Sequence, residues 1–350
     1  IRFETNDFLT VSECMTSEDL VTVPVGTSLE KAKDILQQHR IEKLLVVDED
    51  HNLTGLITVK DIQKNEDFPN ACKDSNGRLR VAAAIGVSGD AFERANELAN
   101  VDIDAIVIDT AHGHSRGVLE TISKIKHDNP NIAIIAGNVA TGDGTKALID
   151  SGVDCVKVGI GAGASCTTRV IAGVGVPQLT AIMDAVDAAK EFNIPIIADG
   201  GLRYSGDIAK ALAAGADSVM VGSLLAGMDE SPGETILYEG RQYKSYRGMG
   251  SMGAMEQGSG DRYFQEGAEA TKLVPEGIEG MVPYRGPVQN TIHQLMGGVR
   301  SSMGYCGCET VKEFGEKTTM VQVTGAALKE NHPHEVRIVK EAPNYQASEG

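Results

Sequence analysis

The chain has 350 residues, of which 41% are hydrophobic and 4% aromatic, with no Trp and a net charge of −17. Such a chain can bury the core of one large or two smaller domains. The acidic balance excludes a basic nucleic-acid or anionic-membrane surface, although backbone N–H groups can still bind a small phosphorylated ligand. No apolar run reaches the roughly 18 residues of a membrane span. The chain shows no signal peptide and does not begin with Met, so we expect an incomplete N-terminus.

The six cysteines have the spacing of neither a disulfide framework nor a zinc site. They are Cys14, Cys72, Cys155, Cys166, Cys306 and Cys308, and no pair of them forms a C-x-x-C motif. We therefore interpret them as reduced thiols of a cytoplasmic protein.

Residues 10–64 predict a compact unit of helix, strand, turn and strand. A capping-box pattern at Thr27-x-x-Glu30 precedes an apolar helical stripe, and two β-branched runs follow at 44–47 and 56–58. Residues 64–78 are polar and rich in turn formers, so the domain boundary is expected there, with domains at 1–66 and 67–350.

From residue 79 onward, short apolar strands alternate with amphipathic helices. The predicted strands are Leu79–Ile85, Ala105–Ile108, Ile132–Ala136, Cys155–Gly159, Ile194–Ala198 and Ser218–Val221. An Asp-x-apolar-x-apolar repeat begins at Asp104, Asp154 and Asp217, and Gly152 and Gly215 stand where helix C-caps are expected. This rhythm predicts a parallel sheet covered on both faces.

Both a closed barrel and an open doubly wound sheet fit this rhythm, and the strand ends favour the barrel. Polar residues or glycines follow nearly every strand, whereas an open sheet concentrates its chemistry at one switch point. We therefore predict an α/β fold of the (β/α)8 TIM-barrel class, with about six of the eight strands in this chain.

The glycine-rich loop Gly159–Arg169 is the most informative stretch for chemistry. Its alternate glycines let the backbone approach a ligand or ion, and Cys166, flanked by hydroxyls and followed by Arg169, has surroundings that can favour a thiolate. From spacing alone, a nucleophilic cysteine and a phosphate loop with an incidental cysteine both remain open.

Three further features have a functional and a plain structural interpretation. Asp199 could grip a ribose diol or form a turn, and Gly222-Ser223 could bind phosphate or make a tight turn. Residues 247–290 could be a functional lid, anchored through Asp261–Phe264, or a solvated insertion. His112 and His114 lack a third ligand, so contact with a ligand, or a hydrogen-bonded loop histidine without a functional role, is a better interpretation than a metal site.

Together these motifs resemble inosine-5′-monophosphate (IMP) dehydrogenase along nearly the whole chain. They are Ile108-Asp-Thr-Ala-His-Gly-His-Ser115, Ala136-Gly-Asn-Val139, the Cys166 loop continued by Ala172-Gly-Val-Gly-Val-Pro-Gln178, Ala198-Asp-Gly-Gly201, Tyr246-Arg-Gly-Met-Gly250, Gly260-Asp-Arg-Tyr-Phe264 and Glu341-Ala-Pro-Asn-Tyr345. Residues 10–64 resemble the second of two regulatory CBS repeats, with Gly55-Leu-Ile-Thr58-x-x-Asp61 as the nucleotide-facing end and Ile1–Glu4 as the tail of the first repeat. In that family the repeats lie between barrel strands two and three, which implies that two strands and one repeat are missing upstream.

The resemblance implies NAD-dependent oxidation of IMP to XMP, the committed step of guanine nucleotide synthesis. Cys166 would attack C2 of IMP, hydride would pass to NAD, and water would hydrolyse the covalent thioimidate once a mobile flap at about 247–290 replaces NADH. Arg262 and Tyr263 would arrive with that flap, Arg262 as the water-activating base. Thr168 with Glu276 offers a second proton route, which matters because an isolated guanidinium hardly deprotonates.

The resemblance also implies the binding residues. Substrate would be held by Ser165, Asp199, Gly200, Gly201, Gly222, Ser223, Tyr246, Gly248, Met249, Gly250 and Glu276, and NAD by Asp109, Asn138, Gly159 and Gly161. Carbonyls of Gly161, Gly163 and Cys166 would bind K⁺ together with Glu330, Asn331 and His332 of a neighbouring subunit, which implies a homotetramer. An adenine or guanine nucleotide would be the ligand of the CBS unit, and no nucleic acid or membrane partner is expected.

The chain departs from the family pattern at several positions. Ala162 and Ala164 replace the usual Pro and Ser, and the loss at 164 removes an expected phosphate contact unless Ser165 substitutes. Asn331, Met281 and Leu45 replace a usual Ser, Arg and Pro. Two alternatives therefore stay open: a catalytically impaired purine-nucleotide-binding regulatory protein, and GMP reductase. GMP reductase shares the cysteine loop but is expected to lack the CBS insert and the Arg-Tyr flap.

Overall fold

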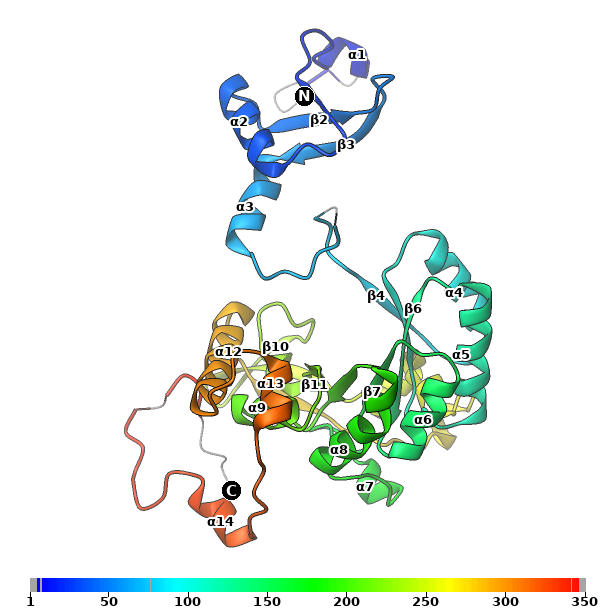
Figure 1. Ribbon diagram of the computed structural model, residues 1–350, viewed down its shortest axis with the longest axis vertical. Helices are drawn as coiled ribbons and strands as arrows, with labels where there is room; N and C mark the ends of the chain where they lie inside the picture. Colours follow the sequence, from blue (N-terminus) through cyan, green and yellow to red (C-terminus); the bar gives the residue numbers. More distant parts are fainter. Residues whose placement is uncertain (1–4, 7, 76, 341, 346–350) are drawn as a thin grey trace. The chain divides into compact units, whose positions relative to one another are not determined.

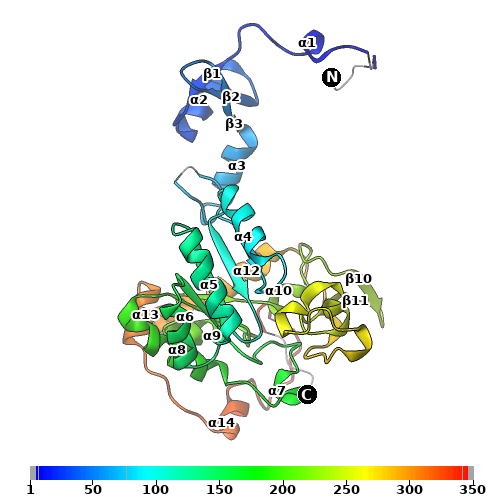
Figure 2. The same ribbon diagram turned by 90° about the vertical axis from the view of Figure 1, so that its right-hand side faces the viewer.

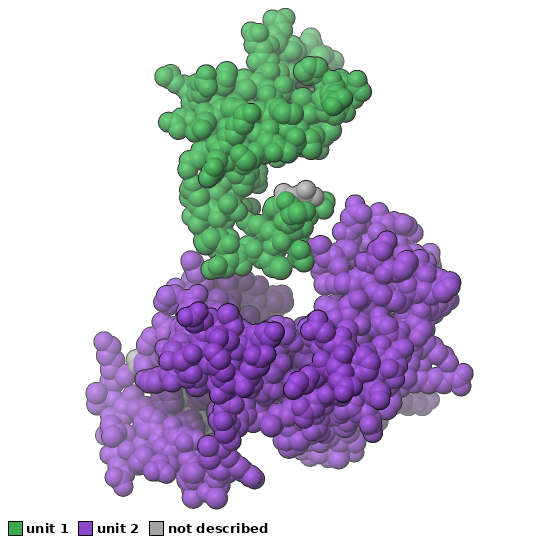
Figure 3. Space-filling view, in the orientation of Figure 1, with its two compact units in different colours: residues 1–80 green, residues 81–350 purple. Residues whose placement is uncertain are grey.

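The computed structural model describes residues 5–6, 8–75, 77–340 and 342–345, and it divides into two compact units, residues 1–80 and 81–350 (Figure 3). The division falls after the boundary at residue 66 that we expected from composition. Residues 72–80 pair among themselves, since Arg80 N donates to the Cys72 carbonyl at 3.0 Å. The predicted tail of a first repeat, Ile1–Glu4, and Glu341 of the last motif lie outside the described residues.

The first unit is a three-stranded sheet with helices. After the short helix α1 (Val11–Cys14), the elements are β1 (Thr22–Pro24), α2 (Leu29–His39), β2 (Lys43–Val47), β3 (Leu53–Thr58) and α3 (Val59–Asp67). This agrees with the predicted helix and two strands. The predicted capping box was wrong: Ser28 caps α2 by accepting from Lys31 N, because the Thr27 hydroxyl donates to the Pro24 carbonyl instead. Thr58 and Asp61 form a capping box on α3.

The second unit is built on a six-stranded parallel sheet in the order β4-β5-β6-β7-β8-β9, which is an α/β half-barrel (Figure 1). The strands are β4 (Ala82–Ile85), β5 (Ala105–Asp109), β6 (Ala133–Val139), β7 (Cys155–Val158), β8 (Ile196–Asp199) and β9 (Ser218–Met220). All six predicted strands are present within a few residues. β4 starts three residues later than predicted, because Leu79 forms an isolated bridge with Lys73 instead.

Helices alternate with these strands and cover the sheet, as α5, α6 and α8 show in Figure 2. They are α4 (Ala91–Asn100), α5 (Arg116–Asp128), α6 (Gly142–Asp150), α7 (Thr168–Ile171), α8 (Gln178–Ala189), the 3₁₀ turn η1 (Lys190–Phe192), α9 (Ser205–Ala213) and α10 (Ser223–Ala226). Apolar side chains of α5, such as Ile122 and Ile125, pack with strand residues such as Ile106 and Ile134 in one buried core. Burial of this apolar surface is the main term that stabilises the fold.

The Asp repeat seen in the sequence has a structural cause. Carboxylates of Asp104, Asp154 and Asp217 accept from the backbone N–H of Val81, Ile134 and Ile196 at 2.7, 2.7 and 2.8 Å. Each Asp also donates its own N–H to the carbonyl of the same residue. Each Asp therefore clamps the start of the preceding strand. Gly152 and Gly215 take φ of 99° and 100°, as predicted for helix C-caps.

A second sheet, which the sequence analysis missed, follows the half-barrel strands. Strands β10 (Thr235–Tyr238), β11 (Arg241–Arg247) and β12 (Glu279–Pro283) pair antiparallel. Glu239 and Gly240 join β10 to β11 with positive φ at both positions, as a tight hairpin requires. Part of the predicted lid, 247–290, therefore belongs to this sheet as β12.

The rest of the lid consists of short helical turns, and three helices follow it. The turns are α11 (Met252–Ala254), the π turn η2 (Met255–Ser259) and the 3₁₀ turns η3 (Asp261–Tyr263) and η4 (Ala270–Lys272). The helices are α12 (Val288–Tyr305), α13 (Val311–Lys317) and α14 (Gly325–Glu330). Among the described residues, no helix combines the length and apolar character that a membrane crossing needs.

Candidate active site

A cavity of about 710 Å³ lies among the loops that follow strands β5 to β9. All of the residues predicted for catalysis and substrate binding line it, together with several predicted for NAD and K⁺, although they come from widely separated parts of the chain. The predicted residues in its wall are Asn138, Gly159, Gly161, Gly163, Ser165, Cys166, Thr168, Asp199, Gly200, Gly201, Gly222, Ser223, Tyr246, Gly248, Met249, Gly250, Arg262, Tyr263 and Glu276.

Asp109 and the triplet Glu330–His332 are not part of the cavity wall. Asp109 ends β5 and is ion-paired with Arg262, which does line the cavity. Glu330 ends α14 and His332 Nδ1 lies 2.9 Å from the Tyr345 hydroxyl of the same chain. The structure therefore places the triplet apart from the cysteine loop of its own chain.

The cysteine loop adopts the irregular backbone that its glycines predict. Gly161 has φ of 73°, and a Cβ there would come within 2.7 Å of the Arg169 side chain. Arg169 packs beneath the loop and donates to the Val176 carbonyl at 2.8 Å, so it does not face the cavity. The expectation that Arg169 contributes to the surroundings of the thiol was therefore wrong.

Cys166, Thr168 and Glu276 form a hydrogen-bonded row. The Cys166 Sγ lies 3.1 Å from Thr168 Oγ1, and that hydroxyl donates to Glu276 Oε2 at 2.7 Å. A hydroxyl has a single O–H donor, and Thr168 uses it in the hydrogen bond to Glu276. Its oxygen can therefore act only as an acceptor toward the Cys166 thiol or a nearby water. The row can therefore carry a proton from the cysteine, or from a water beside it, to a carboxylate.

The lid is docked on the cysteine loop through backbone pairing. Thr167 N donates to the Glu276 carbonyl at 2.9 Å, and Ile278 N donates to the Ser165 carbonyl at 3.0 Å. Gly250 lies under Tyr263, and a Cβ on Gly250 would approach the Tyr263 ring to 2.8 Å. Glu276 and Tyr263 thus reach the cysteine because the lid is closed over it.

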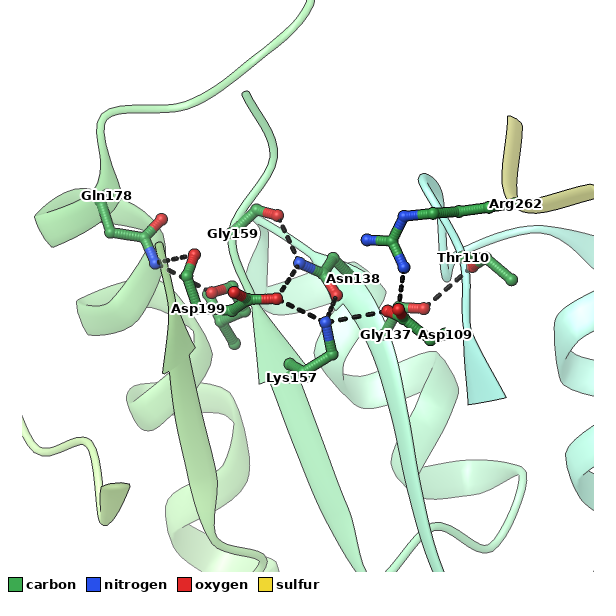
Figure 4. Close-up of polar contacts among 10 residues, drawn as sticks. Asp109, Thr110, Gly137, Asn138, Lys157, Gly159, Gln178, Asp199 and Arg262 are labelled. Carbon is green, nitrogen blue, oxygen red and sulfur yellow. Dashed lines mark hydrogen bonds and ion pairs between the residues drawn. The ribbon is translucent and has the colours of Figure 1, made fainter. Parts of the chain in front are cut away.

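One polar side chain from each of four neighbouring strands joins a single cluster, and two of the four, Asn138 and Asp199, line the cavity (Figure 4). Lys157, in the middle of β7, is ion-paired with Asp199 and lies 2.9 Å from Asp109 Oδ1. Asn138 accepts from Lys157 and donates to Asp199 Oδ2 at 2.9 Å and to the Gly159 carbonyl at 2.7 Å. A side chain at Gly137 would collide with the backbone of Lys157, so only glycine fits beside it.

Sequence analysis missed Lys157, although its signal was present. It is the single charged residue of the strand Cys155-Val-Lys-Val158, where the Asp repeat drew attention to the alternate apolar positions. Its side chain is 2% exposed, and a buried lysine is rare unless paired.

The Arg262–Asp109 ion pair joins the lid to the cluster around Lys157 and affects the pKa of both partners. Burial raises the pKa of Asp109, but the hydrogen bond from Arg262 and the charges of Lys157 and Arg262 outweigh it and hold that pKa below its usual range. Burial lowers the pKa of the Arg262 guanidinium, and the Asp109 hydrogen bond and charge more than reverse this. Arg262 is therefore a firmly held cation in this arrangement. Burial also raises the pKa of the Tyr263 phenol, partly offset by the charge of Arg262.

The position of Ser165 bears on the departure at Ala164. The Ser165 hydroxyl lies 3.5 Å from the Tyr246 hydroxyl, and a Cβ on Gly248 would approach Ser165 Oγ to 2.9 Å. Ser165 thus faces the residues predicted to surround the phosphate, where a hydroxyl at 164 was expected.

All six cysteines are free thiols in the structure, as predicted. Burial raises the pKa of the Cys155 thiol to about 12, which makes it unreactive. His112 lines the cavity, and within the described part of the chain no three His, Cys, Asp or Glu side chains gather as metal ligands.

These features define a (β/α)-barrel enzyme with a cysteine-centred cavity closed by a lid, and the comparisons with known proteins identify its family. The sequence pattern of the IMP dehydrogenase / GMP reductase domain matches residues 31–334. The chain therefore belongs to the IMP dehydrogenase / GMP reductase family.

Several curated relatives are similar along nearly the whole chain. Inosine-5′-monophosphate dehydrogenases of Halalkalibacterium halodurans and Bacillus subtilis are each 58% identical over 99% of this chain and 71% of their own length. The enzyme of Aquifex aeolicus is 58% identical over 96% of this chain and 68% of its own length.

A solved structure of GMP reductase from Trypanosoma brucei, a cysteine-to-alanine variant in complex with guanosine 5′-monophosphate, has the same fold. The TM-score is 0.83 at 40% identity, over 91% of this chain and 65% of that one, so this chain spans less than two thirds of that protein. Residues 81–350 are 270 of 350 residues, or about 77% of this chain, so the match extends into the first unit. Our expectation that such a unit separates the two activities was therefore wrong for that GMP reductase.

Proposed function

We propose that the chain oxidises IMP to XMP with NAD as hydride acceptor, as an IMP dehydrogenase. The observation that carries the proposal is the hydrogen-bonded row of Cys166, Thr168 and Glu276 in a cavity that Arg262, the ion-pair partner of Asp109, also lines. The 58% identity to curated IMP dehydrogenases supports this activity over that of GMP reductase.

In this proposal Cys166 is the nucleophile toward C2 of IMP. Asp199 holds the ribose hydroxyls, and Gly201, Gly222, Ser223 and Tyr246 surround the phosphate, with Ser165 in place of the usual hydroxyl at 164. Met249 and Gly250 contact the base. The cavity volume of about 710 Å³ lies within the roughly 300–1,000 Å³ range of small-molecule sites.

NAD supplies the hydride-accepting nicotinamide, and Asp109, Asn138, Gly159 and Gly161 are proposed to hold it. In the closed structure Arg262 is ion-paired with Asp109, so NAD and the lid compete for the same carboxylate. This suits a two-step reaction, because the site serves hydride transfer with the lid away and hydrolysis with the lid in place.

For the hydrolytic step we propose Thr168 with Glu276 as the main proton route. The hydrogen bonds of that route are already formed, whereas Arg262 is held protonated by Asp109. Arg262 and Tyr263 then act by closing the cavity and orienting water, with Arg262 able to serve as base only after losing its ion pair.

K⁺ is the proposed ion of the cysteine loop. Among the described residues, no hydrogen-bond donor reaches the carbonyl oxygens of Gly161 and Cys166, and carbonyl oxygens are the ligands that K⁺ prefers in proteins. Gly163, Glu330, Asn331 and His332 would complete the set, the last three from a neighbouring subunit of a homotetramer.

The first unit is proposed to be a partial CBS module that binds an adenine or guanine nucleotide. Thr58 and Asp61, at its expected nucleotide-facing end, are paired in the α3 capping box, so a ligand would meet them already fixed. The free thiols support a cytoplasmic location.

The test is incubation of the chain with IMP and NAD while NADH absorbance and XMP are followed. The proposal expects both products in equal amounts. No NADH would contradict it and would favour the nucleotide-binding regulatory protein. Consumption of GMP with NADPH instead would favour GMP reductase.

A further inference from the structure

Lys157 is a charged side chain of β7 that is only 2% exposed, and it contacts the cavity residues Asn138 and Asp199. Its ammonium lies between Asp109 on β5 and Asp199 on β8 and also donates to Asn138 on β6 (Figure 4). A lysine ammonium has three N–H donors. Two of them are donated to Asn138 and Asp199, and the ammonium also forms an ion pair with Asp109, so its partners come from three different strands.

The two carboxylates need a cation between them. The side chains of Asp109 and Asp199 are only 26% and 20% exposed, so their mutual repulsion is poorly screened by water. One ammonium shared by both neutralises part of that repulsion and fixes where each carboxylate points. Lys157 also fixes Asn138, because the amide that accepts from Lys157 must turn its NH₂ toward Asp199 and Gly159.

The charge of the cluster depends on the lid. With Arg262 in place, the cations Lys157 and Arg262 balance the carboxylates Asp109 and Asp199, so the four side chains together are neutral. When the lid opens and takes Arg262 away, Lys157 is the cation that stays beside Asp109 and Asp199, since it lies on the barrel strand β7. The orientation of both carboxylates then depends on Lys157.

We propose that Lys157 is a positioning residue that couples the ribose-binding carboxylate Asp199 to the lid-binding carboxylate Asp109. The proposal rests on the proposed function, since it takes Asp199 as the group that binds the ribose. Lys157 acts through these carboxylates and does not touch the reacting atoms.

Lys157→Met removes the charge and keeps the length of the side chain. Asp199 then loses its cationic partner and keeps the Asn138 amide, and we expect IMP affinity to fall roughly thirtyfold or more, the lower end for removing one member of a buried charge pair. Asp109 keeps Arg262 as its partner, so lid closure competes more strongly with NAD and the KM for NAD rises as well. We expect kcat to change much less than either KM.

The matched control is Lys126→Met. Lys126, on α5, also forms a lysine–aspartate ion pair, with Asp154 just before β7, and its side chain is 28% exposed. Loss of that pair is expected to lower stability while IMP affinity stays within twofold of the unaltered chain.

The experiment measures IMP binding by calorimetry without NAD, for the unaltered chain, Lys157→Met, Asp199→Asn and the double variant. Positioning through Asp199 predicts that the double variant binds IMP about as weakly as Asp199→Asn alone. Additive losses, or unchanged IMP affinity in Lys157→Met, would overturn the proposal.

A second variant covers the case in which Lys157→Met does not fold. Lys157→Gln keeps hydrogen-bonding capacity without the charge and is expected to weaken IMP binding in the same non-additive way. Lys157→Arg keeps the charge and is expected to recover most of the affinity. If the unaltered chain binds IMP but forms no NADH, the proposed function fails while the binding cycle still decides the role of Lys157.

Discussion

Replacing Thr168 by Val removes the hydroxyl that joins Cys166 to Glu276 and keeps the shape of the side chain. The change deletes one contact of 3.1 Å to sulfur and one hydrogen bond of 2.7 Å to a carboxylate. A hydrogen bond to a charged group contributes about 1.5–3 kcal/mol. If the bond serves the hydrolytic transition state, that range corresponds to a roughly 10- to 150-fold slower water step.

Rapid mixing with IMP and NAD separates the two chemical steps. The variant is expected to release a burst of NADH at nearly the normal rate and then to turn over slowly, because the proposed role of the Thr168–Glu276 bond is in the hydrolytic step. Thr180→Val, on the exposed face of α8, is the control and should leave both phases unchanged. If Thr168→Val slows the burst and leaves the later phase unchanged, or alters neither, the assigned proton route is wrong.

Two further predictions concern stability. The pKa of Asp109 is lower in the folded than in the unfolded chain, so its contribution to the free energy of unfolding is fully present above about pH 4 and is lost as pH falls through the folded pKa. Asp109→Asn should therefore make the free energy of unfolding, measured in urea, less dependent on pH in the acid range. An unchanged dependence on pH would argue against the ion pairs of Asp109. Gly215→Ala should destabilise more than Gly152→Ala, since both have positive φ but only the Cβ at 215 would meet Val186, at 2.7 Å. The first should cost about 2–4 kcal/mol and the second about 1–2, and equal losses in thermal unfolding would contradict the steric argument.

The half-barrel was predictable because local patterns and long-range contacts agree there. Each clamping Asp stands at a fixed place before its strand, so the same residue that makes the contact also marks the strand in the sequence. The antiparallel sheet was harder to predict because β11, Arg241–Arg247, carries three basic residues. One of them, Lys244, is nevertheless buried, because its ammonium donates to the carbonyls of Met228 and Ser231.

The parts of the site carried by one short motif were likewise predictable, whereas the pairings between motifs were not. The cysteine loop and the Asp199 turn each lie within one stretch of sequence and line the cavity as expected. The Asp109–Arg262 ion pair joins the first barrel motif to the lid, and no spacing in the chain specifies it. Lys157 was missed for a related reason, since its importance comes from the two carboxylates that the fold brings to it.

The covalent state of Cys166 during turnover tests the central claim most directly. The chain is mixed with IMP and NAD, and the reaction is quenched in acid within one turnover. After digestion, the mass of the peptide that contains Cys166 is measured by mass spectrometry. The account predicts that this peptide carries a purine nucleotide, that Thr168→Val raises the modified fraction, and that Cys166→Ala forms neither adduct nor NADH. NADH production by Cys166→Ala, or turnover with the nucleotide on another residue, would contradict it.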